Sequence, residues 1–269
     1  AVTGTADSIG LTLANATGAA TTTITGAVET INLTSSTSAN SVRLDSDATT
    51  LNISGSQDLT LAAASTVLNL TTVIDASAAT GAISLAHDHT TAATGVTITG
   101  GSGNDSITLT GTNAATDTVN GGAGNDTITF TAAQSELVDA DTVDGGAGTD
   151  TLAGDDDDLA ALTTANNISN IEVIQADTAL ATTLTLANID TSIKSVTLAE
   201  GANAGTVVFG AGSNTLGMGA ANGGLLTVND TGLATNDTLT INASNTVDSF
   251  AGNAVAINGF ETVNFNTGT

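Results

Sequence analysis

Cysteine, proline, tryptophan and tyrosine are all missing from this chain of 269 residues, and aromatic residues make up only 2 % of it. Without cysteine there is neither a disulfide framework nor a thiolate metal site. Without proline, the turns must be built from Gly, Asn and Asp. A core of Ala, Val, Ile and Leu favours thin, repetitive layers over a large globule.

Basic residues are almost absent as well. Only Arg43 and Lys194 stand against 27 acidic residues, so the formal net charge is −25. Such a chain has no cations that could displace the counterions of nucleic acid, and it repels anionic membranes, so neither is expected as a partner. It also repels itself when it is compact, and divalent cations are the natural counter-charge.

Targeting and membrane signals are missing too. No apolar run approaches the roughly 20 residues that cross a bilayer, so no membrane insertion is expected. The chain begins AVTGTADS, without an initiator Met, a basic region or an apolar leader. We therefore expect a mature or internal piece of a longer protein.

Motifs for catalysis are equally scarce. Both histidines lie in the segment 87–89, there is no Cys or Tyr, and no Gly-x-Ser-x-Gly elbow occurs. The acidic residues are accounted for by turns and by the loops described below. The sequence predicts that this chain is not an enzyme.

Short runs in which apolar and polar residues alternate recur along the whole chain. This period of two is typical of strands with one buried face, and Thr, which is β-branched, suits the outer face. Gly, Asn, Asp or Ser separate most of the runs. Examples are Leu51-Asn52-Ile53, Leu59-Thr60-Leu61, Val96-Thr97-Ile98, Val196-Thr197-Leu198 and Leu239-Thr240-Ile241.

A second repeat indicates how the strands are connected. The segment 257–265 resembles 168–174 and 24–33, and 189–198 is a looser copy; each has an apolar anchor, a short turn and a strand. Self-similar units with short strands predict a solenoid in which each unit buries its face against the next. Helix should be limited to two short segments. One begins at Thr131–Gln134 and the other begins at Asp155–Asp158.

Three segments share one glycine-rich spacing. They begin at Gly100, Gly121 and Gly145 and read GGSGNDSI, GGAGNDTI and GGAGTDTL. The glycines permit positive φ angles, so that backbone carbonyl oxygens can turn toward one point, and the single Asp adds a carboxylate. Calcium accepts six to eight oxygen ligands, more than one such loop supplies but as many as two stacked loops can offer.

This G-G-x-G-x-D-x-U pattern resembles the calcium-binding nonapeptide of RTX proteins. The resemblance is close over 100–158, and it implies a parallel β-helix or β-roll with calcium between successive turns. The metal is implied by the resemblance. The ligand set that it implies is Gly100, Ser102, Asn104, Asp105, Gly121, Ala123, Asn125, Asp126, Gly145, Ala147, Thr149 and Asp150, with Asp117 and Asp141 as weaker candidates.

The spacing of the loops supports stacking. They are 21 and 24 residues apart, against about 18 for two nonapeptides, so the excess reads as insertions in the opposite half-turn. The three loops should then lie on one side of the roll, with one ion between the loops of Asp105 and Asp126 and another between those of Asp126 and Asp150. The alternative is that they are plain Gly-Asn-Asp turns without metal.

Other polar residues have simpler interpretations. Asp58 and Asp237 echo the Asp-x-apolar half of the motif, but Asx turns explain them better than metal ligation does. The triplet His87-Asp88-His89 could form half of a zinc site, yet an exposed loop is favoured. The acidic run Asp155–Asp158 could gather cations, but a solvated turn or helix start is favoured.

Beyond the motif, the chain resembles RTX-type calcium-binding surface-layer proteins and the related adhesins that Gram-negative bacteria export. The resemblance rests on an acidic Thr/Ala/Asn/Gly-rich composition and on phrases such as Gly259-Phe260-Glu261-Thr262-Val263. It implies type I secretion, a location at the bacterial cell surface, calcium-driven self-assembly into a lattice, and anchoring to cell-surface polysaccharide through another region. An RTX adhesin segment and the calcium-folded C-terminal region of a secreted hydrolase are the alternatives.

Three segments are expected along the chain. The sequence predicts a Thr/Ala-rich solenoid over 1–98, a calcium-binding β-roll over 99–158 and a further solenoid over 159–269, which could be continuous with the first two.

Overall fold

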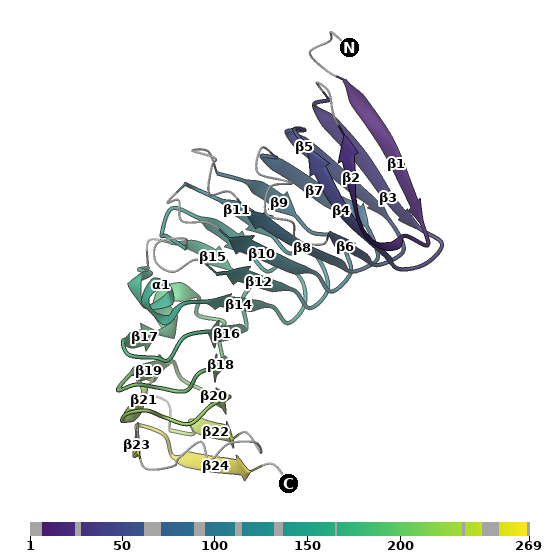
Figure 1. Ribbon diagram of the computed structural model, residues 1–269. Helices are drawn as coiled ribbons and strands as arrows, with labels where there is room; N and C mark the ends of the chain where they lie inside the picture. The colour runs from purple at the N-terminus through teal and green to yellow at the C-terminus, as the bar shows by residue number, and fades with distance from the viewer. Residues whose placement is uncertain are drawn as a thin grey trace. The chain divides into compact units, whose positions relative to one another are not determined.

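The chain folds as an all-β solenoid of parallel strands (Figure 1). The structure is a computed structural model, and it describes residues 7–24, 28–61, 71–88, 95–110, 115–131, 137–164, 166–232, 235–243 and 253–267. The predicted all-β parallel solenoid is confirmed. The chain divides into two compact units, 1–136 with 140–150 (unit 1) and 137–139 with 151–269 (unit 2). The division into three segments stays a prediction.

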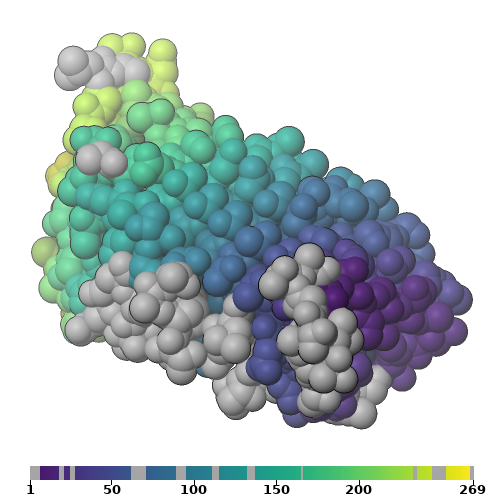
Figure 2. All heavy atoms as spheres, turned by 90° about the horizontal axis from the view of Figure 1, so that it is seen from above, coloured from purple at the N-terminus to yellow at the C-terminus, as the bar shows by residue number. Residues whose placement is uncertain are grey.

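In unit 1 each coil contributes one strand to each of two parallel sheets. The coils follow one another in chain order, and the colour of the surface accordingly changes steadily from purple to teal (Figure 2). One sheet runs through β1 (Ser8–Ala14), β3 (Thr30–Ser36), β5 (Thr50–Gly55), β7 (Val73–Ala79), β9 (Thr97–Thr99), β11 (Thr118–Asn120) and β13 (Thr142–Asp144). The other runs through β2 (Thr17–Ile24), β4 (Asn40–Ser46), β6 (Leu59–Leu61), β8 (Ile83–Asp88), β10 (Ser106–Thr110) and β12 (Thr127–Phe130).

The coils of unit 2 likewise contribute their strands to two parallel sheets. One sheet runs through β14 (Thr151–Gly154), β16 (Val173–Ala176), β18 (Ser195–Leu198), β20 (Ser213–Met218), β22 (Thr238–Ala243) and β24 (Thr262–Thr267). The other runs through β17 (Thr183–Thr185), β19 (Thr206–Phe209), β21 (Leu226–Asp230) and β23 (Val255–Asn258), and the short strand β15 (Asn167–Ser169) also belongs to this unit.

Aliphatic columns hold the coils together. Parallel pairing in register places one apolar residue of each coil directly above the equivalent residue of the next. In unit 1 the column is Ile31, Leu51, Ile74, Ile98, Val119 and Val143, each at most 1 % exposed. In unit 2 it is Leu152, Ile174, Val196, Leu216 and Ile241. Full burial of each such side chain contributes about 1.5–3 kcal/mol.

Helix is confined to two short segments of the described residues, α1 (Asp156–Ala161) and α2 (Leu186–Ile189). The helix start predicted at the acidic run is confirmed, since Asp155 is the N-cap of α1. The other short segment, predicted after Thr131, falls largely on 132–136, outside the described residues. In the described parts of the chain, neither helix has the length or the apolar character of a membrane-spanning segment.

Candidate metal centre

The three glycine-rich loops stack on one edge of unit 1. Gly100–Asp105 joins β9 to β10, Gly121–Asp126 joins β11 to β12, and Gly145–Asp150 follows β13. Main-chain hydrogen bonds tie each loop to the next, from Ala123 N–H to Gly101 O (3.0 Å) and from Ala147 N–H to Gly122 O (2.9 Å). The arrangement brings equivalent positions of the loops directly above one another.

Glycine is required where the loops approach each other most closely. A Cβ on Gly121 would lie 2.5 Å from Asp126 Oδ2 and 2.5 Å from the carbonyl oxygen of Gly145, closer than real Cβ contacts. Gly122 has φ +104°, and a Cβ there would collide with the Gly101 carbonyl oxygen. The missing side chain of Gly121 therefore leaves a cradle on which a carboxylate and a carbonyl oxygen converge.

The Asp of each loop connects two coils through a ladder of hydrogen bonds. Ile83 N–H donates to Asp105 Oδ1 (2.8 Å), and Asp105 N–H donates in turn to Asp126 Oδ1 (2.7 Å). Asp126 N–H then donates to Asp150 Oδ1 (2.7 Å). The three side chains are only 1–2 % exposed. The structure thus brings the three predicted aspartates together as one buried column, the carboxylate column.

Burial disfavours the charged form of the Asp105 and Asp126 carboxyl groups. Burial, together with the charges of Asp105 and Asp150, raises the pKa of the Asp126 carboxyl to about 6, against the opposing hydrogen bond from Asp105 N–H. Burial likewise raises the pKa of Asp105. Within the described residues no hydrogen-bond donor reaches the buried Asp126 Oδ2. A buried anionic oxygen without a donor is unfavourable unless a proton or a cation meets it.

The donor set fits calcium. The oxygens at the cradle are carboxylate and main-chain carbonyl, the hard ligands that calcium prefers. No set of three or more His, Cys, Asp or Glu side chains gathers as a metal site in the described parts of the chain. Main-chain carbonyl groups of the loops would therefore have to complete the coordination, as the sequence prediction of ligands at Gly100, Ser102, Ala123 and Ala147 already requires.

The Asn and Thr positions of the loops form a second, outer ladder. Asn125 N–H donates to Asn104 Oδ1 (2.8 Å), and Thr149 N–H donates to Asn125 Oδ1 (2.9 Å). All three residues are exposed. These side chains hold neighbouring loops in register on the solvent side, whereas the aspartates do so on the buried side.

The two weaker candidates form a column of their own. Val96 N–H donates to Asp117 Oδ1 (2.8 Å), and Asp117 N–H donates to Asp141 Oδ1 (2.8 Å). Both aspartates are fully buried. They precede β11 and β13 directly, whereas the glycine-rich loops follow those strands. This column thus lies at the other ends of the strands from the loops of Asp126 and Asp150.

The raised pKa of Asp126 makes the stability of unit 1 depend on pH. In the calcium-free protein we expect unit 1 to be more stable at about pH 5 than at about pH 7.5. The folded state, with the pKa of Asp126 at about 6, binds the proton more tightly than the unfolded chain, with its ordinary value of 3.8. The stability that protonation of Asp126 contributes is therefore fully present below about pH 4 and is lost as the pH rises through 6. Urea denaturation across this range, with chelator present, measures it, and D126N should flatten the profile.

Comparison with protein-family models, with curated proteins and with solved structures finds no match to this chain.

The interpretation of His87 as part of an exposed loop is wrong. His87 lies in β8, is 1 % exposed, and its Nε2–H donates to the carbonyl oxygen of Thr71 (2.9 Å). The alternation of Ile83, Leu85 and His87 places all three on the inner face of the strand. His89 lies outside the described residues.

The acidic run is not a solvated turn throughout. Asp156 is 7 % exposed, and its carboxylate accepts hydrogen bonds from Thr178 Oγ1 (2.9 Å) and Ala181 N–H (2.9 Å). Asp158 is also buried, whereas Asp157 is exposed. Only part of this run faces solvent, because α1 packs against the next coil.

Hydrogen bonds from the main chain to acidic side chains of neighbouring coils also occur outside the glycine-rich loops. One such side chain is Asp237, which the sequence indicated only as part of an Asx turn. This residue is 1 % exposed; its Oδ1 accepts from Gly212 N–H (2.6 Å), and its own N–H donates to Glu261 Oε2 (2.8 Å). Asp7 N–H donates to Glu29 Oε2 (2.7 Å) in the same way. The sequence signal that could have indicated these contacts is an acidic residue that closely precedes a strand in each of two successive coils.

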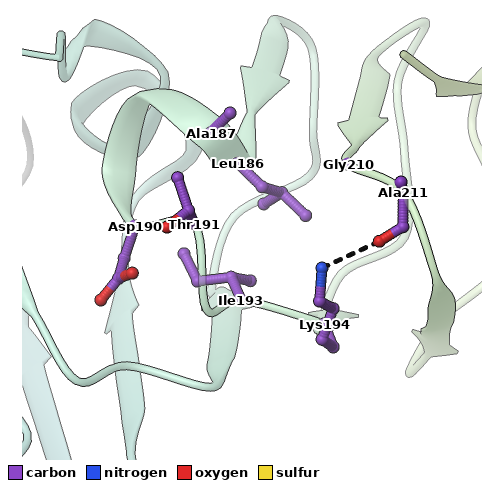
Figure 3. Close-up of a pocket in the computed structure, with 8 residues that line it drawn as sticks. All are labelled: Leu186, Ala187, Asp190, Thr191, Ile193, Lys194, Gly210 and Ala211. Carbon is purple, nitrogen blue, oxygen red and sulfur yellow. Dashed lines mark hydrogen bonds between the residues drawn. The ribbon is translucent and has the colours of Figure 1, made fainter. Parts of the chain in front are cut away.

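Unit 2 also carries a small pocket of about 210 Å³ beside α2 (Figure 3). Leu186, Ile193 and the neighbouring main chain give it a mainly apolar lining. Two of its polar side chains already have partners: Lys194 Nζ donates to the lining Ala211 O (3.0 Å), and the Asp190 carboxylate accepts from Ser192 N–H (2.8 Å). The pocket therefore adds nothing to the carboxylate column.

Proposed function

We propose that this chain is a structural segment of an extracellular bacterial surface layer, folded by calcium at its glycine-rich loops and assembled into a lattice with other copies. The observation that supports this most is the buried column of Asp105, Asp126 and Asp150 in a chain of net charge −25. In this column Asp126 Oδ2 is buried and no donor among the described residues reaches it, so its charge calls for a compensating proton or cation.

Calcium would be held where neighbouring loops meet. The Asp126 carboxylate, with Oδ2 buried and no donor reaching it within the described residues, and the carbonyl oxygens of the stacked loops are the groups that would bind it. When bound, the ion would supply positive charge beside the buried Asp126 carboxylate. The Asp105 and Asp126 main-chain N–H groups hold the carboxylates of the following loops in place, so the ligands are positioned by the solenoid itself.

Neutralisation of the carboxylates by calcium would make folding depend on whether the chain is inside or outside the cell. Where calcium is scarce, as in the cytoplasm, repulsion between the carboxylates opposes the compact state and keeps the chain exportable, which suits type I secretion. Outside the cell calcium is abundant, and an ion that binds only the folded state stabilises it by mass action. Self-assembly follows the same logic, because copies that each carry −25 repel one another until cations screen or bridge them.

Electron microscopy of the purified chain tests this proposal. With millimolar calcium we expect two-dimensional sheets, and removal of the calcium with chelator should dissolve them. Magnesium at the same concentration serves as the control for plain screening of charge, and it should not replace calcium. Dispersed rods in calcium would contradict the surface-layer function and favour an adhesin segment or the tail of a secreted hydrolase.

A further inference from the structure

Two aspartates in one coil of unit 2 lie close together, away from the glycine-rich loops. Asp230 is the last residue of β21, and Asp237 directly precedes β22. Asp237 is 1 % exposed and is fixed by the bonds from Gly212 N–H (2.6 Å) and to Glu261 Oε2 (2.8 Å). Asp230 Oδ1 accepts from Gly232 N–H (2.7 Å). One oxygen of each carboxylate is thus engaged with the main chain.

The other oxygen of each carboxylate is buried and lacks a donor. Asp230 Oδ2 and Asp237 Oδ2 have no hydrogen-bond partner among the described residues. The two carboxyl groups lie within hydrogen-bonding reach of each other, and burial followed by this contact raises the pKa of Asp230. Two neighbouring carboxylates that each keep a buried oxygen without a donor repel each other unless a proton or a cation compensates them.

The surroundings of the pair favour a cation over a shared proton. Glu261 adds a third negative charge that acts on Asp230, so a single proton would leave two charges uncompensated. The pair is also enclosed: a Cβ on Gly259, in the following coil, would lie 2.9 Å from Asp230 O and 3.2 Å from Asp230 Cβ. Gly212, on the other side, belongs to the preceding coil. The pair is therefore positioned between coils.

We propose that Asp230 and Asp237 bind a divalent cation of the calcium class, which joins successive coils of unit 2. No third acidic, His or Cys side chain converges with them in the described residues, so main-chain oxygens and water would complete the shell. This site has no glycine-rich motif, lies in the other unit from the carboxylate column and does not depend on the proposed function. It gives unit 2 a calcium response of its own.

The substitution D237N tests the site. Asn at 237 keeps an oxygen for Gly212 N–H and places an N–H donor toward Asp230 Oδ2, so the fold no longer needs the ion. In equilibrium dialysis with radioactive calcium, D237N should bind one ion fewer per chain than the parent protein. In hydrogen-exchange mass spectrometry, calcium should slow exchange in 226–243 about tenfold in the parent protein and leave D237N unchanged.

The controls separate this site from the carboxylate column. D157N changes an exposed Asp of the same unit and should bind calcium like the parent protein. D126N should lose calcium in unit 1 but keep the calcium response of 226–243. If D237N fails to fold, D230N takes its place with the same expectations. An unchanged ion count and exchange response in the variant, or exchange in the parent protein that responds to pH but not to calcium, would overturn the proposal.

Discussion

The substitution G122V should destabilise unit 1 by about 3–5 kcal/mol, a large part of the roughly 5–15 kcal/mol by which a typical domain is stable. Gly122 has φ +104°, a conformation that valine rarely adopts, and its Cβ would collide with the carbonyl oxygen of Gly101 in the preceding coil. Relief of that collision would break the bond from Ala147 N–H to Gly122 O (2.9 Å), which ties this loop to the next. Strain and lost stacking therefore act together.

Urea denaturation followed by circular dichroism, in millimolar calcium, measures this effect. The matched control is G10V, since Gly10 lies in β1 of the same unit and a Cβ there would meet nothing within 4 Å. G10V should leave the denaturation midpoint close to that of the parent protein. If G122V and G10V had the same midpoint, the close stacking of the glycine-rich loops would be refuted.

Removal of calcium at neutral pH should have an effect of similar size. Two ions, between the three loops, would each contribute about 2.7 kcal/mol at a free concentration one hundred times the Kd. Together these contributions are comparable with the whole stability of a typical domain. We therefore expect chelator to abolish most of the β-type circular dichroism of unit 1, and renewed calcium to restore it.

Acid provides an internal check on this result. Protons and calcium would compete for the same carboxylates, so lowering the pH to about 5 should partly rescue the chelated protein and should weaken any calcium binding. Magnesium should rescue it poorly, because it demands a tighter octahedral shell than loops of backbone carbonyls offer. Identical spectra and unfolding curves with and without chelator would contradict a role for calcium in folding.

The strands and loops could be predicted because their signals are local. In Leu51-Asn52-Ile53 the alternation alone tells which residues face inward, and the structure buries Leu51 and Ile53 at 1 % exposure. The glycines at 121 and 122 likewise predict a tight turn. Each of these signals can be read within a few residues of sequence.

The environment of single polar residues could not be predicted, because it is set by the neighbouring coils. His87 is buried since Thr71, 16 residues earlier, offers it a carbonyl oxygen. Asp237 is buried since Gly212, 25 residues earlier, offers it an N–H group. The coil length varies along the chain, so the register that brings such partners together is visible only in the folded solenoid.

The presence of an ion beside the carboxylate column is tested most directly by anomalous X-ray diffraction from crystals grown in millimolar calcium. We predict anomalous peaks between the loops of Asp105 and Asp126 and between those of Asp126 and Asp150, with Asp126 Oδ2 among the ligands. If the loops were well ordered but no peak lay between them, and the Asp126 carboxyl were hydrogen-bonded only to protein or water, the presence of an ion beside the carboxylate column would be contradicted.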